Sequence, residues 1–238
     1  MSSCKPKNLN RIDDMSAEIL SRLKEHTQLL QQIEFSEDFE THPALSEIVR
    51  ELDAIAICEA EGIVGVHYTR GEQGHFSRDG LVPCSGYERR IKFLEEHGYR
   101  FSSAQLERLK QGWQSYFTHE QNKVRDGRVW FNLTRVAMSN GGAEPLLSHY
   151  GGEVVYMPFS QDTEIESILR EIGSPLIIEC ALYPRNARTF CEHPWGRTWL
   201  SSYHCTVNPD ALQWDVDLYT EEPIDPGAIL NIEVVEVD

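Results

Sequence analysis

Apolar residues recur at intervals of three and four over the first half of the chain, the spacing that places them on one face of a helix. Pro43 suits the first turn of a helix, and Ser16 is a favourable residue at a helix start. The spacing predicts helices over residues 14–32, 43–60, 72–80, 87–97 and 102–118. A short apolar run over residues 63–68 predicts a buried strand.

The pattern changes after the turn sequence Asp126-Gly127. Short apolar runs bounded by Gly, Pro, Asn and Asp follow, and such runs are typical of strands. The predicted strands cover residues 129–133, 154–157, 176–182, 197–207, 212–219 and 228–237, with short helices over 143–149 and 163–172. Helices first and strands second favour an α+β fold over a doubly wound parallel sheet.

The composition fits one domain, or one domain with an extension. The chain has 238 residues, of which 40% are hydrophobic and 10% aromatic, enough for a sizeable core. No apolar run approaches the ~18–20 residues of a membrane helix, and the first residues show no apolar signal region, so we expect no membrane association and no secretory signal. Six scattered cysteines form no dense disulfide pattern, which favours a reducing, cytoplasmic setting.

Charge is distributed unevenly along this acidic chain. The formal net charge of −16 disfavours long-range attraction to phosphate backbones. Residues 208–238 hold nine acidic residues and no Lys or Arg, whereas residues 85–135 hold ten basic residues against six acidic ones. The basic stretch also holds aromatic residues, namely Tyr87, Phe93, Tyr99, Phe101, Trp113, Tyr116 and Phe117. On helices this pattern is typical of amphipathic packing with a basic outer face, and the alternative is a platform for an acidic or nucleic-acid target.

Several common catalytic motifs are missing from the sequence. It contains no GxxxxGK[ST] loop, no GxGxxG after a predicted strand, no HExxH, no GxSxG and no paired CxxC. A P-loop enzyme, a kinase and an α/β-hydrolase are therefore disfavoured.

The first candidate site is His67-Tyr68-Thr69-Arg70, at the end of a predicted strand. An imidazole there can hydrogen-bond a ribose hydroxyl, and the ordinary alternative is a structural histidine at a strand end. The sequence HYTRGEQGHFSRDGL resembles the first motif of diphtheria-toxin-type ADP-ribosyltransferases, in which a strand runs into His-x-Thr-Lys/Arg, a short helix and Gly-Leu. The resemblance implies that these four residues bind NAD. His67 would contact the adenosine ribose, the Tyr68 backbone the nicotinamide amide, and Arg70 the pyrophosphate.

The second candidate site combines residues 129–133, which include Trp130, with Tyr150 before a Gly-Gly pair. These residues resemble the second motif of the same family, a strand with adjacent aromatics followed by a loop, a short helix and a Tyr. The resemblance implies that Trp130 and Tyr150 stack on the two faces of the cationic nicotinamide ring. Trp130 replaces the usual Tyr of the family. The alternative is that both rings are part of the core.

The third candidate site is the acidic segment before the last predicted strand. The family ends with a strand that carries a catalytic Glu, then a Pro-containing turn and a final strand. The Glu hydrogen-bonds the 2′-hydroxyl of the nicotinamide ribose and stabilises the charge that develops there. One alignment implies Asp217 or Asp215 for this role, and the other implies Glu221 or Glu222. An Asp is one methylene shorter than the Glu of the family, and a solvated acidic face is the alternative.

The resemblance implies an ADP-ribosyltransferase-like core, a split mixed or antiparallel sheet, over residues 62–238. A helical insertion would cover about 86–126, and a helical extension would cover residues 1–61. The implied activity is transfer of ADP-ribose from NAD, as substrate, to a macromolecular acceptor, with RNA or DNA favoured over protein. Small transferases of this kind resemble toxins of toxin–antitoxin or antiviral systems, so the acidic amino-terminal helices are available to an antitoxin or chaperone.

Two other classes of function stay open from the sequence. A catalytically inactive module with the same fold would bind a partner without turnover, which an Asp in place of Glu would explain. A zinc-stabilised interaction domain would use the four possible ligands around residues 191–205, which are Cys191, His193, His204 and Cys205. Their spacing matches no zinc site known to us, so we expect no metal.

Overall fold

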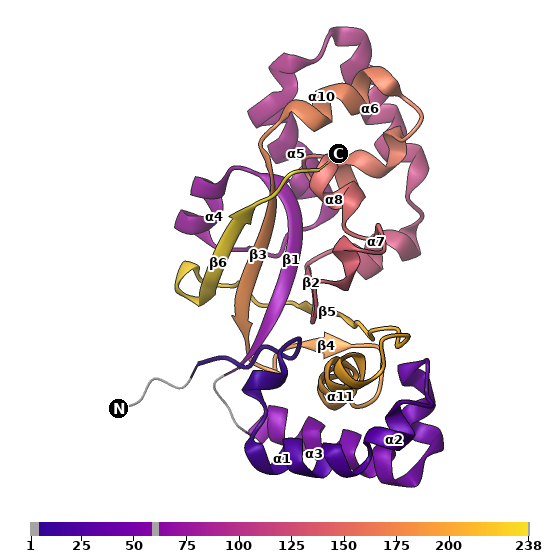
Figure 1. Ribbon diagram of the computed structural model, residues 1–238. Helices are drawn as coiled ribbons and strands as arrows, with labels where there is room; N and C mark the ends of the chain where they lie inside the picture. The colour runs from indigo at the N-terminus through magenta and orange to yellow at the C-terminus, as the bar shows by residue number, and fades with distance from the viewer. Residues whose placement is uncertain (1–4, 59–61, 238) are drawn as a thin grey trace. The chain divides into compact units, whose positions relative to one another are not determined.

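The computed structural model describes residues 5–58 and 62–237, and these residues form an α+β fold (Figure 1). The described helices are α1 Ala17–Glu25, α2 Thr27–Leu30, α3 Pro43–Cys58, α4 Gln73–Asp79, α5 Gly86–His97, α6 Ser103–Tyr116, α7 His119–Arg125, α8 Glu144–Ser148, α9 Glu153–Tyr156, α10 Thr163–Glu171 and α11 Pro194–Val207. Short 3-10 helices lie at Ile12–Asp14, Ser36–Thr41, Gly98–Arg100, Val136–Met138, Met157–Phe159 and Pro226–Ala228. No described helix is both long enough and apolar enough to cross a bilayer.

The strands form one open sheet. They are β1 Ile63–Gly71, β2 Val129–Asn132, β3 Ser174–Leu182, β4 Arg188–Thr189, β5 Asp217–Thr220 and β6 Ile229–Val234. Their order in the sheet of the described residues is β4-β5-β2-β1-β3-β6. Strands β1 and β2 pair antiparallel with Val66 opposite Asn132, and β4 and β5 pair antiparallel with Arg188 opposite Tyr219. The α+β class expected from the sequence is confirmed.

The chain divides into two compact units that do not follow its linear order. Unit 1 contains the described residues of Met1–Val66, Trp130–Asn140 and Cys180–Tyr219. Unit 2 contains those of His67–Val129, Gly141–Glu179 and Thr220–Asp238. This division differs from the boundary expected at residues 61 and 62. The amino-terminal helices share a unit with α11, so they belong to the core of that unit.

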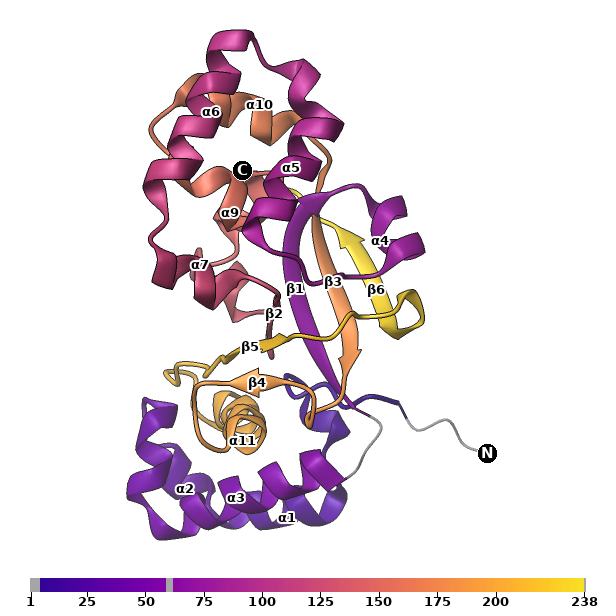
Figure 2. The same ribbon diagram turned by 180° about the vertical axis from the view of Figure 1, so that it is seen from behind.

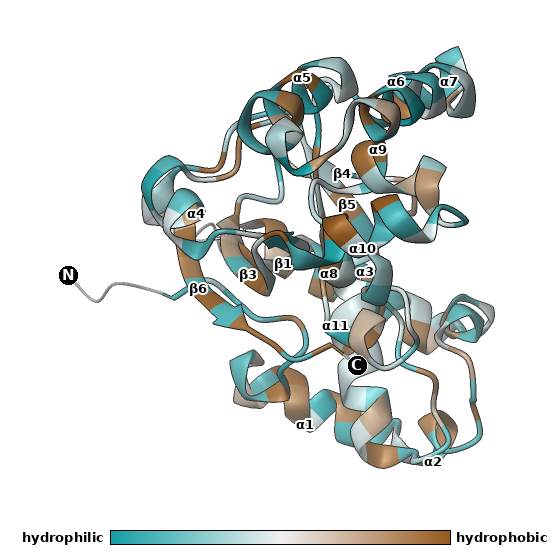
Figure 3. Ribbon diagram, turned by 90° about the horizontal axis from the view of Figure 1, so that it is seen from above, coloured by the Kyte–Doolittle hydropathy of each residue, from teal (hydrophilic) through white to brown (hydrophobic). Residues whose placement is uncertain are grey.

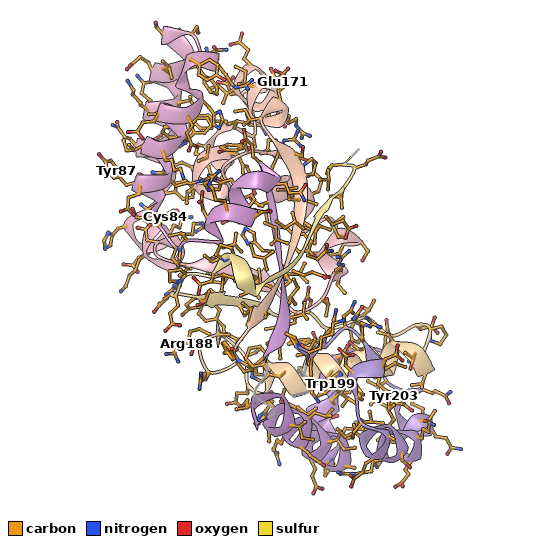
Figure 4. The ribbon with its side chains drawn as sticks, turned by 90° about the vertical axis from the view of Figure 1, so that its left-hand side faces the viewer. Cys84, Tyr87, Glu171, Arg188, Trp199 and Tyr203 are labelled. Carbon is orange, nitrogen blue, oxygen red and sulfur yellow. The ribbon has the colours of Figure 1, made fainter. Side chains whose placement is uncertain are left out.

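Helix α11 of unit 1 packs against α3 and α2 (Figure 1). Its residues from Pro194 to His204 are all buried, and Trp199 is fully enclosed. Figure 4 labels Trp199 and Tyr203 on this helix. At its start, the buried carboxylate of Asp53 accepts hydrogen bonds from the backbone N–H groups of Trp195 and Gly196, each at 3.0 Å. Helix α3 therefore supplies the cap of α11.

The prediction of a strand over residues 197–207 is wrong, because this segment is helical. An amphipathic helix shows a period of 3.6 residues, but a helix buried on every side shows none. The segment RTWLSSYHCTV therefore has no helical period in its sequence although it is a helix. The prediction of a strand over 154–157 is wrong as well, since helix α9 follows Gly151 and Gly152, whose φ angles are +95° and +75°. Of the strand expected over 212–219, only residues from Asp217 onward are extended in the sheet.

The helices of unit 2 enclose a core of their own (Figure 2). Helices α5, α6 and α7 begin with capping boxes at Ser85, Ser102 and Thr118. In each box the Ser or Thr side chain accepts a hydrogen bond from the backbone N–H of the third helical residue, and the side chain of that residue accepts one from the backbone N–H of the Ser or Thr. Both apolar and polar residues appear along α5 and α6 (Figure 3). The described part of the insertion expected at about 86–126 is thus helical, and its apolar face packs against residues of α9 and α10.

Candidate functional site

Within the basic stretch, residues 86–125 fold largely as amphipathic helices. Of the seven aromatic rings from Tyr87 to Phe117, four are buried, and they are Phe93, Phe101, Trp113 and Phe117. Several of its arginines have specific partners. Arg108 pairs with Asp162 and Glu164, and Arg125 pairs with Glu153. The buried rings are unavailable for stacking on a nucleic acid, so amphipathic packing accounts for these four rings.

The predicted site residues are divided between the two units. Trp130, Asp215 and Asp217 belong to unit 1. The four residues from His67 to Arg70, together with Tyr150 and Glu221, belong to unit 2. The site is therefore described unit by unit.

In unit 1, strands β2 and β5 bring an aromatic pair and a polar pair together on one face. The rings of Trp130 and Tyr219 lie 4.9 Å apart between centroids. The side-chain amide of Asn132 donates a hydrogen bond of 2.9 Å to the exposed carboxylate of Asp217. Residues two apart in a strand share a face, so these cross-strand pairs are neighbours. We call Trp130, Asn132, Asp217 and Tyr219 the β2–β5 face.

Asp215 has a different environment from Asp217. Its Oδ1 accepts hydrogen bonds from the backbone N–H groups of Leu133, Thr134 and Val216. Its Oδ2 is buried without a hydrogen-bond partner in the described structure. This carboxylate therefore anchors the chain after β2 to the chain before β5. Of the two aspartates that the resemblance allows for catalysis, Asp217 is the one open to a ligand.

The folding stability of the protein should depend on the protonation of Asp215. Burial raises its pKa to about 6, against the opposing effect of the backbone N–H donors. The folded protein therefore holds this proton more tightly than the unfolded chain, and the carboxyl stabilises the fold increasingly as the pH falls from about 6 toward its ordinary pKa of 3.8. In Asp215→Asn this contribution is absent. Thermal melts should show the stability of the wild type rising relative to the variant as the pH falls through that range.

The alanine variant separates charge from hydrogen bonding. Relative to Asp215→Asn, Asp215→Ala leaves the N–H groups of Leu133 and Thr134 without this acceptor, which should cost about 2–3 kcal/mol of folding free energy at every pH, because neither variant titrates at this position. Urea unfolding measures this loss. A constant difference between wild type and Asp215→Asn across the pH range would show that Asp215 has an ordinary pKa.

The segment from His67 to Leu81 of unit 2 contains the first predicted site. Strand β1 contains His67, which is half-buried, and Tyr68 and Thr69, which are buried. Helix α4 follows and ends at Gly80, whose φ is +73°. A Cβ at Gly80 would overlap the carbonyl oxygen of Ile224, so both the backbone conformation and the close approach require glycine. The order of strand, short helix and Gly-Leu turn is as expected.

Arg70 is a half-buried cation. Its Nε donates to the carbonyl oxygen of Ile172 at 2.9 Å, and its Nη1 donates to that of Leu147 at 3.3 Å. Burial, and then the nearby Arg170, lower the pKa of Arg70. It forms no ion pair within the described residues. Because an uncompensated charge is costly away from water, this environment favours an anion.

Tyr150 is part of the unit 2 core. It is 8% exposed, and its hydroxyl donates to a carboxylate oxygen of Glu96 at 3.3 Å. The edge of His97 packs against it at 4.6 Å, and the guanidinium of Arg89 lies over its ring at 5.4 Å. Burial raises the pKa of this phenol. A ligand ring would have to displace Arg89 to stack on that face of Tyr150.

Glu221 directly follows β5 and lies on the surface of unit 2. Its Oε1 is 3.7 Å from Nε of Arg128, and its side chain is 63% exposed. Nearby, the hydroxyl of Thr220 accepts a hydrogen bond from the backbone N–H of Glu222, which shapes the turn. Glu221 is thus an accessible carboxylate with a cationic neighbour.

The candidate zinc ligands have other partners. Nε2 of His204 lies 3.0 Å and 2.8 Å from the carbonyl oxygens of Leu30 and Ile33. Nδ1 of His193 lies 3.7 Å from Asp53, and Cys205 Sγ faces the carbonyl oxygen of Ala211 at 3.9 Å. Within residues 5–58 and 62–237, no three His, Cys, Asp or Glu residues are grouped as a metal site requires.

Sequence reasoning missed three residues beside the predicted ones. Asn132 and Tyr219 stand two positions after Trp130 and Asp217 in their strands, so the alternation of side chains along each strand was a usable signal. Phe190 stacks on Trp130, with centroids 6.1 Å apart and planes 27° apart. It lies in an irregular segment after β4, where no periodic pattern marks it.

Comparisons of this chain with protein-family models, with curated proteins and with solved structures find no match.

Proposed function

We propose that the chain is an NAD-dependent ADP-ribosyltransferase that modifies a macromolecule, with a nucleic acid favoured over protein. In this proposal it is a toxin or defence effector whose fold is the split sheet of that family, and an antitoxin or chaperone is its natural partner. The observation that carries the proposal is the β2–β5 face of unit 1. That face holds an aromatic ring pair beside an accessible carboxylate.

The chemistry of the reaction explains why these groups belong together. The glycosidic bond between C1′ of the ribose and the nicotinamide nitrogen breaks, and nicotinamide leaves with the bonding electron pair. The acceptor nucleophile forms a new bond to C1′ and loses its proton. Trp130 would stabilise the flat cationic ring before departure. Asp217 would hold the ribose hydroxyl and stabilise positive charge as it develops on the sugar.

Asn132 would orient the carboxylate of Asp217. Its amide hydrogen bond fixes one carboxylate oxygen and leaves the other for a ribose hydroxyl. A carboxylate held by a neighbour loses less side-chain entropy when it binds. Because Asp is shorter than Glu, this positioning is the feature that would compensate for the missing methylene.

In unit 2, the β1–α4 segment supports the same proposal. It has the expected local structure, and Arg70 is a cation without a carboxylate among the described residues. The resemblance assigns NAD contacts to His67, Tyr68 and Thr69 as well. A pyrophosphate would supply the anion that the environment of Arg70 favours.

Incubation with labelled NAD tests the proposal. The purified protein is mixed with NAD labelled in the adenosine part and with RNA, DNA or cell proteins in separate reactions. We expect label on one class of acceptor and release of free nicotinamide. Absence of both transfer and NAD hydrolysis in every reaction would contradict the proposal.

A second function is an NAD-binding or partner-binding module without turnover. Two observations favour it, namely the short Asp217 in place of Glu and the burial of Tyr150 beneath Arg89. Under this alternative, the same incubation yields saturable binding of NAD without release of nicotinamide.

A further inference from the structure

An exposed segment of unit 1 combines aromatic rings with arginines. We call Tyr183, Arg185, Arg188 and Phe190 the arginine–aromatic segment. Tyr183 is 49% exposed and Phe190 is 73% exposed. The guanidinium of Arg185 lies over the Tyr183 ring at 5.3 Å. Arg188 is exposed on β4 and is labelled in Figure 4.

The segment continues the β2–β5 face. Arg188 is directly opposite Tyr219 in the antiparallel pair, and directly opposed residues project to the same side of a sheet. The ring of Phe190 lies 5.9 Å from Tyr219 and stacks on Trp130. Leu218, which directly precedes Tyr219 in β5, projects to the other side of the sheet and is fully buried. The aromatic rings and Arg188 therefore share the open side of this part of the sheet.

The segment carries unbalanced positive charge. Neither Arg185 nor Arg188 forms an ion pair with a carboxylate of the described residues, and the sequence has no acidic residue between Glu179 and Glu192. By contrast, Arg108 and Arg125 of unit 2 are paired. Guanidinium groups without a carboxylate partner are available to phosphate, which they bind with two parallel hydrogen bonds.

We infer that the arginine–aromatic segment, next to Trp130 and Tyr219, binds single-stranded nucleic acid. The bases would stack on the exposed rings, and Arg185 and Arg188 would contact the phosphates. Stacking requires bases that are free of a duplex. The net charge of −16 opposes binding to a densely charged duplex. Binding of a short single strand whose bases stack on aromatic rings depends less on the net charge. Binding of the nucleic acid stands without the proposed function. Only its role as the acceptor of ADP-ribose rests on the proposed function.

Binding is measured without NAD, by fluorescence anisotropy of labelled strands of about 12 nucleotides, within the ~4–16 that one such surface covers. One arm uses oligouridylate, one oligothymidylate, and a third uses a duplex of the same length. Binding to either single strand with a preference over the duplex supports the inference, and the stronger arm identifies RNA or DNA. Absence of binding to both single strands, or tighter binding to the duplex, overturns it.

Variants locate the surface. Phe190→Ala should weaken binding about 10-fold, since one stacked base contributes a factor of this order. Arg188→Gln should reduce the slope of log affinity against log salt by about 0.7, the value for one phosphate contact of a single strand. The matched control is Tyr99→Ala with Arg100→Gln in unit 2, where Arg100 lies over the exposed Tyr99 ring at 5.5 Å. Unchanged affinity in Phe190→Ala and Arg188→Gln, or an equal loss in the control, overturns the inference.

The two proposals fail separately. The protein could bind single-stranded nucleic acid through Phe190 and yet neither transfer ADP-ribose from labelled NAD nor hydrolyse it. This result would contradict the proposed transferase activity and support the nucleic-acid-binding surface. Transfer of ADP-ribose by a protein that does not bind single-stranded nucleic acid would contradict the binding surface and support the transferase activity. Thermal melts check that Phe190→Ala keeps its fold, and Arg188→Gln provides the same test through a residue without a packing role.

Discussion

Replacing Asp217 with asparagine should lower the rate of ADP-ribose transfer and of NAD hydrolysis by about 100-fold or more. A group that stabilises charge developing in the transition state contributes a factor of about 100–1,000. Asparagine keeps the size of the side chain and removes the negative charge that would stabilise the positively charged sugar. Because Asp217 is exposed, the melting temperature should change little. Release of labelled nicotinamide at saturating NAD measures the effect on turnover.

Two matched variants identify the carboxylate. Glu221→Gln changes an accessible carboxylate in the same part of the sequence, whose neighbour is Arg128, and it should keep most of the activity. Asn132→Ala removes the hydrogen bond to Asp217 and should cause a smaller loss than Asp217→Asn. If Glu221→Gln abolishes transfer and Asp217→Asn does not, the assignment of the carboxylate to Asp217 is wrong.

Replacing Gly196 with alanine should destabilise unit 1 by about 3 kcal/mol, at the upper end for overpacking of a core. Gly196 lies in α11 where that helix crosses α3. An added Cβ would overlap the carbonyl oxygen of Val49 and approach the backbone nitrogen of Asp53 to 2.7 Å. Both obstacles are backbone atoms, so the helices must separate. The two hydrogen bonds from the start of α11 to the Asp53 carboxylate would be strained as well. Urea unfolding measures the change.

Gly74 provides the control for Gly196. It also lies in a helix, α4, and a Cβ there would meet no heavy atom within 4 Å. Gly74→Ala should therefore stabilise the protein slightly, by about 0.5–1 kcal/mol, because alanine favours the helix. Equal effects of the two substitutions would show that the approach of α11 to α3 is not as close as described.

Features that depend on neighbouring residues in sequence were predictable. Helices α5 and α6 have an amphipathic pattern and a Ser that starts a capping box, so their positions follow from residues within one or two turns. Strand β1 and helix α4 were recognised for the same reason, since apolar residues, a polar turn and Gly80 lie in direct succession. The α+β class followed from the order of these patterns.

Helix α11 was not predictable in this way. Its burial on every side removes the periodicity that distinguishes a helix from a buried strand. The group that caps its start is Asp53, more than 140 residues earlier in the chain. Partners from distant sequence hold the segment in a helix, and a local pattern contains no information about them.

The sequence by itself determined the class of fold, the local structure of the β1–α4 segment and a set of candidate side chains chosen by resemblance. The tertiary structure decided which of those side chains a ligand can reach. It buries Tyr150 in a core and uses Asp215 to hold backbone N–H groups, while Asp217 stays open beside Asn132. It also places Phe190 against Trp130 and Arg188 opposite Tyr219. The physical reason is that exposure and hydrogen-bond partners depend on contacts between distant segments, which the packing of the whole unit establishes.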